Sequence, residues 1–459
     1  MNPRTSPKLD VRRVGLFCTA DFGFNLYYSG LSIFLLYYYT DIVGIRPATA
    51  GLIFAIPLLW DAITDPIMGA IASRVPSRHG RFRVFLLFGS VPLALSFVLM
   101  FVAPLVFTAQ VALAAALTHI VFRTAYTVVT VPYSALSANM VLDTEQRGSL
   151  AGMRMICATT GGLFTVLVTL PLANAVGGGD LRLGFVVVAT LYAIISTLLT
   201  LLAFQSTAGV SATSTAPQLA FGDIGRVLLA NRALLILVAA VVLGATGVSV
   251  FSKMLIYFVK YVADVDLPIT AALVSMTGMA AISIPVWMAI SRKLEKKTVW
   301  IIGGTAAALG QIALYVIPPA EGTMVAILLA IGFANGAFYV TFWSMLPDTV
   351  EYGQWRSASR DEGLVFGINL LALKAAAGMG IGALGFLLDA SGFVAGVEQA
   401  PETLARLEAI TTLVPASLMA CAMAVIAFYP ISKRKHRQMV VAIERREARP
   451  APAGEGHDT

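Results

Sequence analysis

Long apolar stretches recur along the whole chain and are separated by short polar segments. A helix needs about 20 mostly apolar residues to cross a bilayer. Stretches of that kind lie at residues 14–40, 48–72, 82–106, 109–138, 149–173, 184–205, 229–262, 268–291, 298–318, 322–347, 362–388 and 409–430. The pattern predicts an all-α membrane protein with about twelve transmembrane helices in two six-helix lobes.

A polar stretch divides this pattern into halves. It includes the run STAGVSATSTAPQ, which is typical of a flexible, solvated linker. Basic loops at 74–83 and 292–297 each follow the second predicted span of their half, as in a two-lobed transporter, although any cytoplasmic loop would be basic. The predicted divisions are an N-terminal lobe at 1–205, a cytoplasmic linker at 206–228, a C-terminal lobe at 229–432 and a cytoplasmic basic tail at 433–459.

The composition supports a membrane protein. Only 12% of the residues are charged and 58% are hydrophobic, with a mean hydropathy of +0.81. Soluble proteins carry about 25% charged residues, so this surface suits lipid rather than water. The net charge is +7, and the basic residues collect in the termini and in alternate loops. The positive-inside rule therefore predicts a multi-pass protein of the cell (inner) membrane with both termini in the cytoplasm, without nucleic-acid binding.

Motifs for ATP-driven transport, metal binding and catalysis are missing. The chain holds no Walker A, HExxH or CxxC sequence and no repeated channel filter. A membrane-embedded enzyme would need a nucleophile with its base, or a metal set, at one depth, and no such group is evident. We therefore predict a carrier driven by an ion gradient, with no enzymatic activity and no cofactor.

Two acidic residues lie near the centre of the second predicted helix. Asp61 is about thirteen residues from its outer end, near the middle of the membrane at 1.5 Å per residue, and Asp65 is one turn deeper. This spacing stacks both carboxylates on one face. Because two unpaired carboxylates cannot both stay ionised there, either one is protonated or a cation binds between them. Permanent neutralisation by basic groups on other helices is the alternative to such a coupling-ion site.

Other predicted helices carry polar stripes and central charges. Polar groups at helical spacing cannot face lipid and are expected to line a shared cavity, although hydroxyls often only bond to the preceding turn. The groups are Asp21, Asn25, Tyr28 and Ser32 in the first helix, Arg123, Thr127, Thr130, Ser134 and Ser137 in the fourth, and Lys374 in the eleventh.

Four sequence blocks resemble a known family. They are DFGFNLYYSGLSIFLLYYYTDIVGI, WDAITDPIMGAIASRVPSRHGRFR, YTVVTVPYSAL and LPDTVEYGQWRSASRDEG, between about residues 15 and 390. The first two, at this spacing, are specific. The chain thereby resembles the glycoside–pentoside–hexuronide:cation symporters, which include melibiose permease. This resemblance implies the major facilitator fold and symport of a sugar with a cation.

The resemblance also implies roles for single residues. Asp21 matches a residue that hydrogen-bonds sugar hydroxyls, and Arg154 matches an arginine on the cytoplasmic side of the sugar pocket. Asp61 and Asp65 match the carboxylates that bind the coupling cation, which makes them metal ligands if that cation is Na⁺. Thr127 matches a threonine at the cation site, and Lys374 matches a lysine beside it with a role in coupling. Thr64 is a further expected cation-site residue. Asn25, Tyr28, Arg123, Thr130 and Ser134, from the polar stripes, are expected along the substrate cavity.

Departures from the family pattern concern the ion and the substrate. Melibiose permease has a sodium-binding asparagine where this chain has Thr64, so a proton is at least as good a candidate as Na⁺. It has a sugar-binding aspartate at the position of Thr130 and a stacking tryptophan at Ser134, so galactoside specificity does not carry over. Arg123 replaces a small residue. It favours an anionic substrate, such as a uronide or sulfonated sugar, unless it only neutralises Asp61.

We therefore predict a secondary transporter that imports a sugar or glycoside with H⁺ or Na⁺ by alternating access. The expected partners are the small-molecule substrate, the coupling cation and membrane lipids, and the protein is expected to be a monomer. A carrier of lysolipids or other amphiphiles is the alternative, which a smooth apolar lateral groove would favour.

Overall fold

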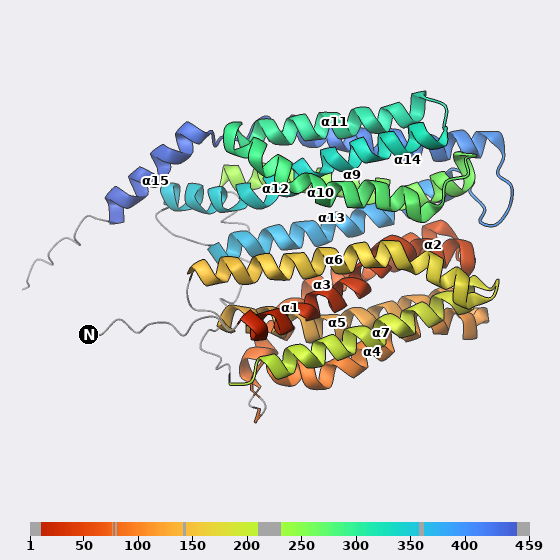
Figure 1. Ribbon diagram of the computed structural model, residues 1–459, viewed down its shortest axis with the longest axis horizontal. Helices are drawn as coiled ribbons and strands as arrows, with labels where there is room; N and C mark the ends of the chain where they lie inside the picture. Colours follow the sequence, from red (N-terminus) through yellow and green to blue (C-terminus); the bar gives the residue numbers. More distant parts are fainter. Residues whose placement is uncertain are drawn as a thin grey trace, which may run out of the picture.

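The computed structural model describes residues 11–75, 77–78, 80–140, 144–209, 231–357 and 362–447. Nearly all of these residues are helical (Figure 1). The first half contains α1 (Val11–Ser29), η1 (Gly30–Phe34), α2 (Leu35–Tyr37), η2 (Tyr38–Ile42), α3 (Pro47–Arg74), α4 (Arg83–Val106), η3 (Thr108–Gln110), α5 (Val111–Met140), α6 (Thr144–Gly177) and α7 (Leu181–Ser206). The second contains α9 (Arg232–Tyr257), η4 (Phe258–Val262), α10 (Ile269–Lys293), α11 (Lys296–Val316), α12 (Glu321–Ser357), α13 (Glu362–Ala390), α14 (Pro401–Ile426) and α15 (Lys433–Glu447).

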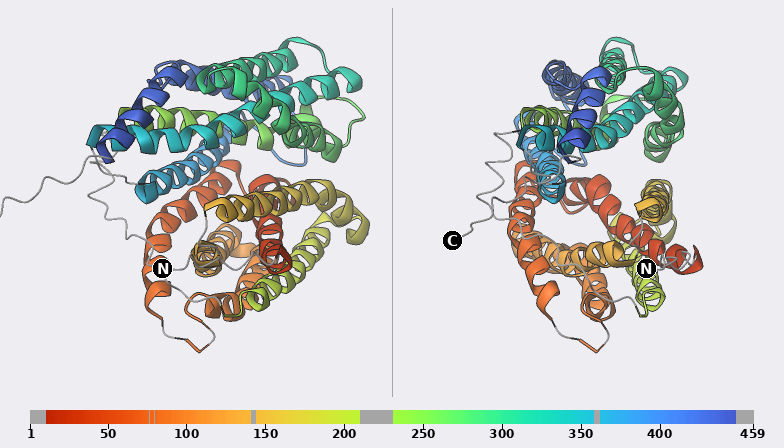
Figure 2. Two further views of the ribbon diagram at one scale, coloured as in Figure 1. Left: turned by 60° about the vertical axis from the view of Figure 1, so that its left-hand side comes forward. Right: turned by 90° about the vertical axis from the view of Figure 1, so that its left-hand side faces the viewer.

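The helices form two lobes, as predicted. Helices α1 to α7 pack among themselves, and α9 to α14 form the second lobe (Figure 2). Contacts between the lobes run mainly from α3 to α13 and from α6 to α10. The predicted linker and the end of the tail fall outside the described residues at 210–230 and 448–459, so the exact divisions stay predictions.

Ten helices of the described part of the chain are long and apolar enough to cross a membrane. The second predicted span corresponds to α3, which is not among these ten helices. It holds two shorter apolar stretches, Pro47–Pro57 and Ile63–Ala72, on either side of the helical turn that contains Asp61. The first predicted span is a series of helical segments, Val11 to Ile42, with π-helical turns at η1 and η2. These elements are compatible with the twelve predicted spans.

The structure corrects the last predicted span. The sequence places it at 409–430, whereas α14 is Pro401–Ile426. Its first two turns are amphipathic, because Thr403 and Leu407 are buried while Glu402 and Arg406 are exposed. Charged residues on the exposed face lower the mean hydropathy of these turns, so hydropathy alone places the start of the helix too late in the sequence.

Basic residues gather at one end of the bundle, where α1 begins and α15 lies (Figure 1). The positive-inside rule makes this the inner end, and we call the opposite end the outer end. At the outer end the lobes approach closely where α3 meets α13. A Cβ atom on Gly51 would lie 2.9 Å from the Gly382 carbonyl oxygen and 3.0 Å from the Gly385 Cα, so only glycine permits this approach.

A polar cluster also joins the lobes at the outer end. The Asp41 carboxylate, at the end of η2, accepts hydrogen bonds from Lys260 (2.7 Å) and Tyr261 (2.5 Å) in η4. The hydroxyls of Thr40 and Tyr257 are 2.8 Å apart. Each lobe therefore contributes a π-helical turn to one cross-lobe contact, and π-helical turns are often found at functional sites.

Candidate cation and substrate site

The acidic pair of α3 lies where the two lobes meet. Asp61 is buried, with 2% of the residue exposed, and its carboxylate accepts a hydrogen bond from Arg123 of α5. Its Oδ2 atom is also 3.9 Å from the Lys374 Nζ atom, which comes from α13 in the other lobe. The Oδ1 atom is buried and has no hydrogen-bond donor among the described residues.

Asp65 binds groups from both lobes. Its Oδ1 atom accepts a 2.8 Å hydrogen bond from the Thr127 hydroxyl of α5. Its Oδ2 atom forms an ion pair with Lys374 of α13. The Asp65 and Lys374 side chains are 27% and 41% exposed, so this half of the pair is accessible, whereas Asp61 is enclosed.

Two acids thus face two bases in this conformation. Arg123 and Lys374 provide the opposite charge, so no cation is required here for balance. The hydroxyl of Thr64, the other threonine predicted at the cation site, donates to the Trp60 carbonyl oxygen of its own helix at 3.0 Å.

A second charged group surrounds Asp21 of α1. Arg154 of α6 donates to both carboxylate oxygens, from Nε at 2.9 Å and from Nη2 at 3.0 Å. The Tyr133 hydroxyl donates to Oδ2 at 2.6 Å, and the guanidinium lies over the Tyr133 ring at 4.8 Å. The structure therefore brings Asp21 and Arg154 together as an ion pair, while their role in binding substrate stays a prediction.

Sequence reasoning missed Tyr133. The residue lies within the block YTVVTVPYSAL, three positions after Thr130, and so shares that side of α5. Only charged and small hydroxyl residues entered the predicted stripe. A phenol at the same spacing is the signal that could have identified it.

The other predicted substrate residues make local contacts. Asn25 donates from Nδ2 to the Asp21 carbonyl oxygen at 2.9 Å, and Thr130 donates to the Tyr126 carbonyl oxygen at 2.8 Å. Tyr28 is 47% exposed, and Ser134 is exposed as well. Of the α5 hydroxyls, Thr130 bonds to the preceding turn as the simpler interpretation predicts, while Thr127 reaches Asp65.

Comparison with known proteins identifies the family. Residues 16–433 match the model of the MFS/sugar transport protein family. The chain belongs to this family. It is 30% identical to the uncharacterized symporter YnaJ of Bacillus subtilis strain 168, over 95% of each chain. It is 26% identical to the glucuronide carrier protein homolog of Escherichia coli K12, over 96% of this chain and 97% of that one.

A solved structure confirms the fold. A bacterial homologue of the human lysosomal transporter Spinster superposes with a TM-score of 0.69 at 14% identity, covering 98% of this chain and 100% of that one. Family, relatives and fold together make this chain a multi-pass membrane transporter of the sugar symporter class and not an enzyme. The resemblance inferred from the sequence blocks is confirmed.

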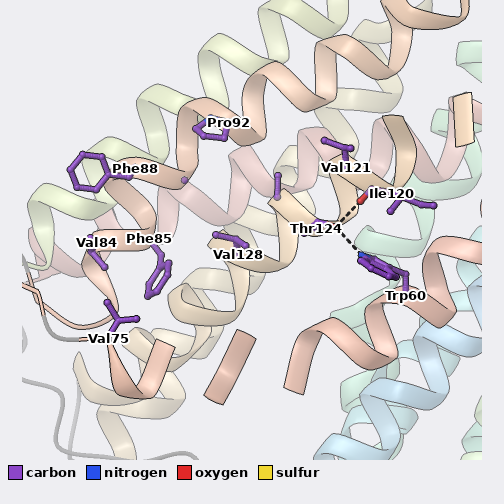
Figure 3. A pocket seen from close by; sticks show the side chains of 12 residues that line it. Trp60, Val75, Val84, Phe85, Phe88, Pro92, Ile120, Val121, Thr124 and Val128 are labelled. Atoms are coloured by element: carbon purple, nitrogen blue, oxygen red, sulfur yellow. Dashed lines mark hydrogen bonds between the residues drawn. The ribbon is translucent and has the colours of Figure 1, made fainter. Parts of the chain in front are cut away.

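This sugar transport protein also has an apolar groove outside the charged site. The groove has a volume of about 690 Å³ and lies between α3, α4 and α5 (Figure 3). The Phe88 side chain is 64% exposed, so the groove opens on the surface of the N-terminal lobe. Two of the lining residues are joined by a hydrogen bond, from Trp60 Nε1 to the Thr124 hydroxyl at 2.8 Å. The lining residues are Trp60, Val75, Val84, Phe85, Phe88, Gly89, Pro92, Ile120, Val121, Thr124, Ala125 and Val128.

Proposed function

We propose that this protein imports a sugar or glycoside together with a cation, H⁺ or Na⁺, by alternating access. The observation that carries the proposal is the position of Lys374. It belongs to α13 of one lobe, yet its ammonium neutralises Asp65 and approaches Asp61 on α3 of the other. The charge balance of the acidic pair therefore depends on how the lobes are arranged.

Movement of α13 away from α3 leaves the acidic pair short of positive charge. Two carboxylates one helical turn apart cannot both stay ionised in the membrane interior without a partner, so a cation or a proton replaces the lysine. The free Oδ1 atom of Asp61, together with Asp65 and the Thr127 hydroxyl, offers oxygen ligands for it. Return of Lys374 then expels the ion.

Coupling follows if substrate and ion favour the same arrangement of the lobes. The sugar binds near Asp21 and Arg154, on helices of the lobe that also carries the acidic pair. Each ligand then raises the affinity for the other by the same factor. An acidic sugar fits this class of carrier, since one relative is named as a glucuronide carrier homologue.

Uptake into vesicles tests the proposal. Neutral and acidic glycosides are offered with a sodium gradient or a proton gradient imposed separately, and one gradient must drive accumulation. Asp61→Asn is expected to exchange substrate across the membrane but not to concentrate it. In this variant Asp65 is the one carboxylate left of the acidic pair, so no cation is needed to relieve repulsion. Active accumulation by Asp61→Asn, or uptake by the unchanged protein that ignores both gradients, would refute the scheme.

The apolar groove supports one second candidate, a carrier of lysolipids or other amphiphiles. Its volume of about 690 Å³ and its apolar lining suit an acyl chain. A lysophospholipid included in the uptake panel distinguishes the two candidates. Saturable lysophospholipid uptake that sugars do not inhibit would favour the amphiphile carrier.

A further inference from the structure

Among the residues that the structure describes, Lys253 is a charged side chain of the membrane interior without a carboxylate partner. Lys253 lies in α9 and is 5% exposed. Its ammonium donates to the Ser249 hydroxyl at 2.8 Å and lies 3.4 Å from the Ser249 carbonyl oxygen. No carboxylate of the described residues lies within 4.0 Å of it.

The other interior cations of the described residues that face this region are neutralised. Arg123 pairs with Asp61, Lys374 with Asp65, Arg154 with Asp21 and Lys260 with Asp41. A lysine buried in a membrane protein is costly unless it is paired or serves a binding site. Lys253 therefore stands out as a positive charge that no carboxylate in the described part of the chain balances.

Lys253 lies on the side of α9 that packs against α13. Thr246 and Lys253 are spaced by seven residues and so share one side of α9, while Lys260 follows in the π-helical turn η4. Thr246 donates to the Ala376 carbonyl oxygen of α13 at 3.2 Å, and Lys260 binds Asp41 of the opposite lobe. This side of α9 therefore faces α13, the helix that carries Lys374 and crosses α3 of the other lobe.

The Lys253 ammonium and the acidic pair lie at similar depths. The ammonium reaches back to Ser249, thirteen residues before the end of η4 at Val262, which is about 20 Å at 1.5 Å per residue. Asp61 is fourteen residues after the start of α3 at Pro47, about 21 Å from that end. A substrate held between the lobes at this depth could reach both groups.

We propose that Lys253 recognises the anionic group of the substrate, a carboxylate or sulfonate carried by an acidic sugar. This inference rests on the proposed sugar import and names its substrate class. A lysine ammonium has three rotatable donors, and an anion supplies the charge that Ser249 lacks. Arg123, the candidate from the sequence, is already bound to Asp61. In this conformation Lys253 is enclosed, and separation of the lobes at the outer end admits the anion.

The test compares two glycosides that differ in one charge, p-nitrophenyl β-glucuronide and p-nitrophenyl β-glucoside. Half-maximal concentrations are measured for uptake by vesicles and for thermal stabilisation of the purified protein. Lys253→Gln is expected to raise the value for the glucuronide by about thirty-fold or more, as for a buried charge pair that loses one partner. The half-maximal concentration for the glucoside is expected to stay within about twofold of that of the unchanged protein. Lys253→Arg keeps the preference, and Lys293→Gln, at the inner end, controls for loss of one charge.

The outcomes separate this inference from the proposed function. Ion-driven uptake of the glucoside with no preference for the glucuronide would overturn the role of Lys253 and leave sugar import standing. Equal loss of both substrates in Lys253→Gln, at normal abundance, would also overturn it, since that marks a structural role. Failure of the unchanged protein to take up any glycoside would refute sugar import itself. If Lys253→Gln does not reach the membrane, the role of Lys253 is judged from the other two proteins. The unchanged protein and Lys253→Arg must both prefer the glucuronide to the glucoside, and loss of this preference in either one would overturn the role.

Discussion

At the scale of residues, opposite charges from different helices meet inside the bundle. Asp61 and Arg123 are both nearly enclosed, with side chains 2% and 9% exposed. Such a pair need not stabilise a protein more than apolar residues would, yet removal of one partner strands a buried charge. Single and paired substitutions therefore differ sharply in their expected effects.

We expect Arg123→Gln to lower the free energy of unfolding by about 3–5 kcal/mol and to abolish transport of every substrate, because it strands the Asp61 carboxylate. The double variant Arg123→Gln, Asp61→Asn should recover most of that stability. Unfolding of the purified variants measures the first effect, and vesicle uptake measures the second. A loss confined to acidic glycosides would instead make Arg123 a substrate ligand.

The sequence predicts much of the charged site and less of its contacts. The i,i+4 spacing of Asp61 and Asp65 and the central place of Lys374 are visible from helical periodicity, and the structure joins the three. Which side chains of different helices pair with each other cannot be predicted from the sequence, because it depends on how those helices rotate and how closely they approach. For this reason the family resemblance assigned Asp21 and Arg154 to one pocket without predicting their ion pair, and Tyr133 was missed.

At the scale of elements, hydropathy places helices well where their surfaces are uniformly apolar. It misplaces the start of α14, and the tail helix α15 was read only as a basic segment. The π-helical turns η2 and η4 leave no mark in hydropathy, because they arise from backbone hydrogen bonds and tertiary contacts. The close crossing of α3 and α13 likewise follows from glycines whose partners lie far away in the sequence.

That crossing gives a prediction for a single added side chain. A Cβ atom on Gly385 would lie 2.7 Å from the Gly51 Cα, so Gly385→Val should hold the outer ends of α3 and α13 apart. Such overpacking costs about 1–3 kcal/mol and shifts the protein toward open outer ends. We expect slower uptake and faster labelling by a membrane-impermeant maleimide of a cysteine placed at Ser32, in a background without native cysteines.

Gly152→Val is the matched control, because a Cβ atom there meets no other atom within 4 Å. It should leave both the uptake rate and the labelling rate of the Ser32 cysteine near those of the parent. Unchanged labelling in Gly385→Val would show that the α3–α13 crossing does not control access from the outer end.

At the scale of the whole molecule, a polar cluster joins the lobes at the outer end, and the proposed transport cycle requires its groups to separate. The Asp41 side chain is fully enclosed and depends on Lys260 for its charge balance. The lysine ammonium also lies over the rings of Tyr37 and Tyr261, at 4.8 and 4.9 Å. In the proposed alternating-access cycle, substrate enters from outside after this cluster opens, and release inside follows once it reforms.

Lys260→Gln should therefore change two measurements in opposite directions. Loss of a hydrogen bond from a charged donor, worth about 1.5–3 kcal/mol, weakens the closed outer end and populates the open form. The apparent affinity for substrate added outside should rise, because a larger fraction of the molecules have an open outer end and can bind it. The uptake rate should fall, because closing the outer end after binding becomes less favourable. Arg182→Gln, which removes an exposed outer cation bonded to the Ile42 carbonyl oxygen, is the control. A fall in both affinity and rate in Lys260→Gln would mean that the cluster supports the fold of the outer end rather than its opening.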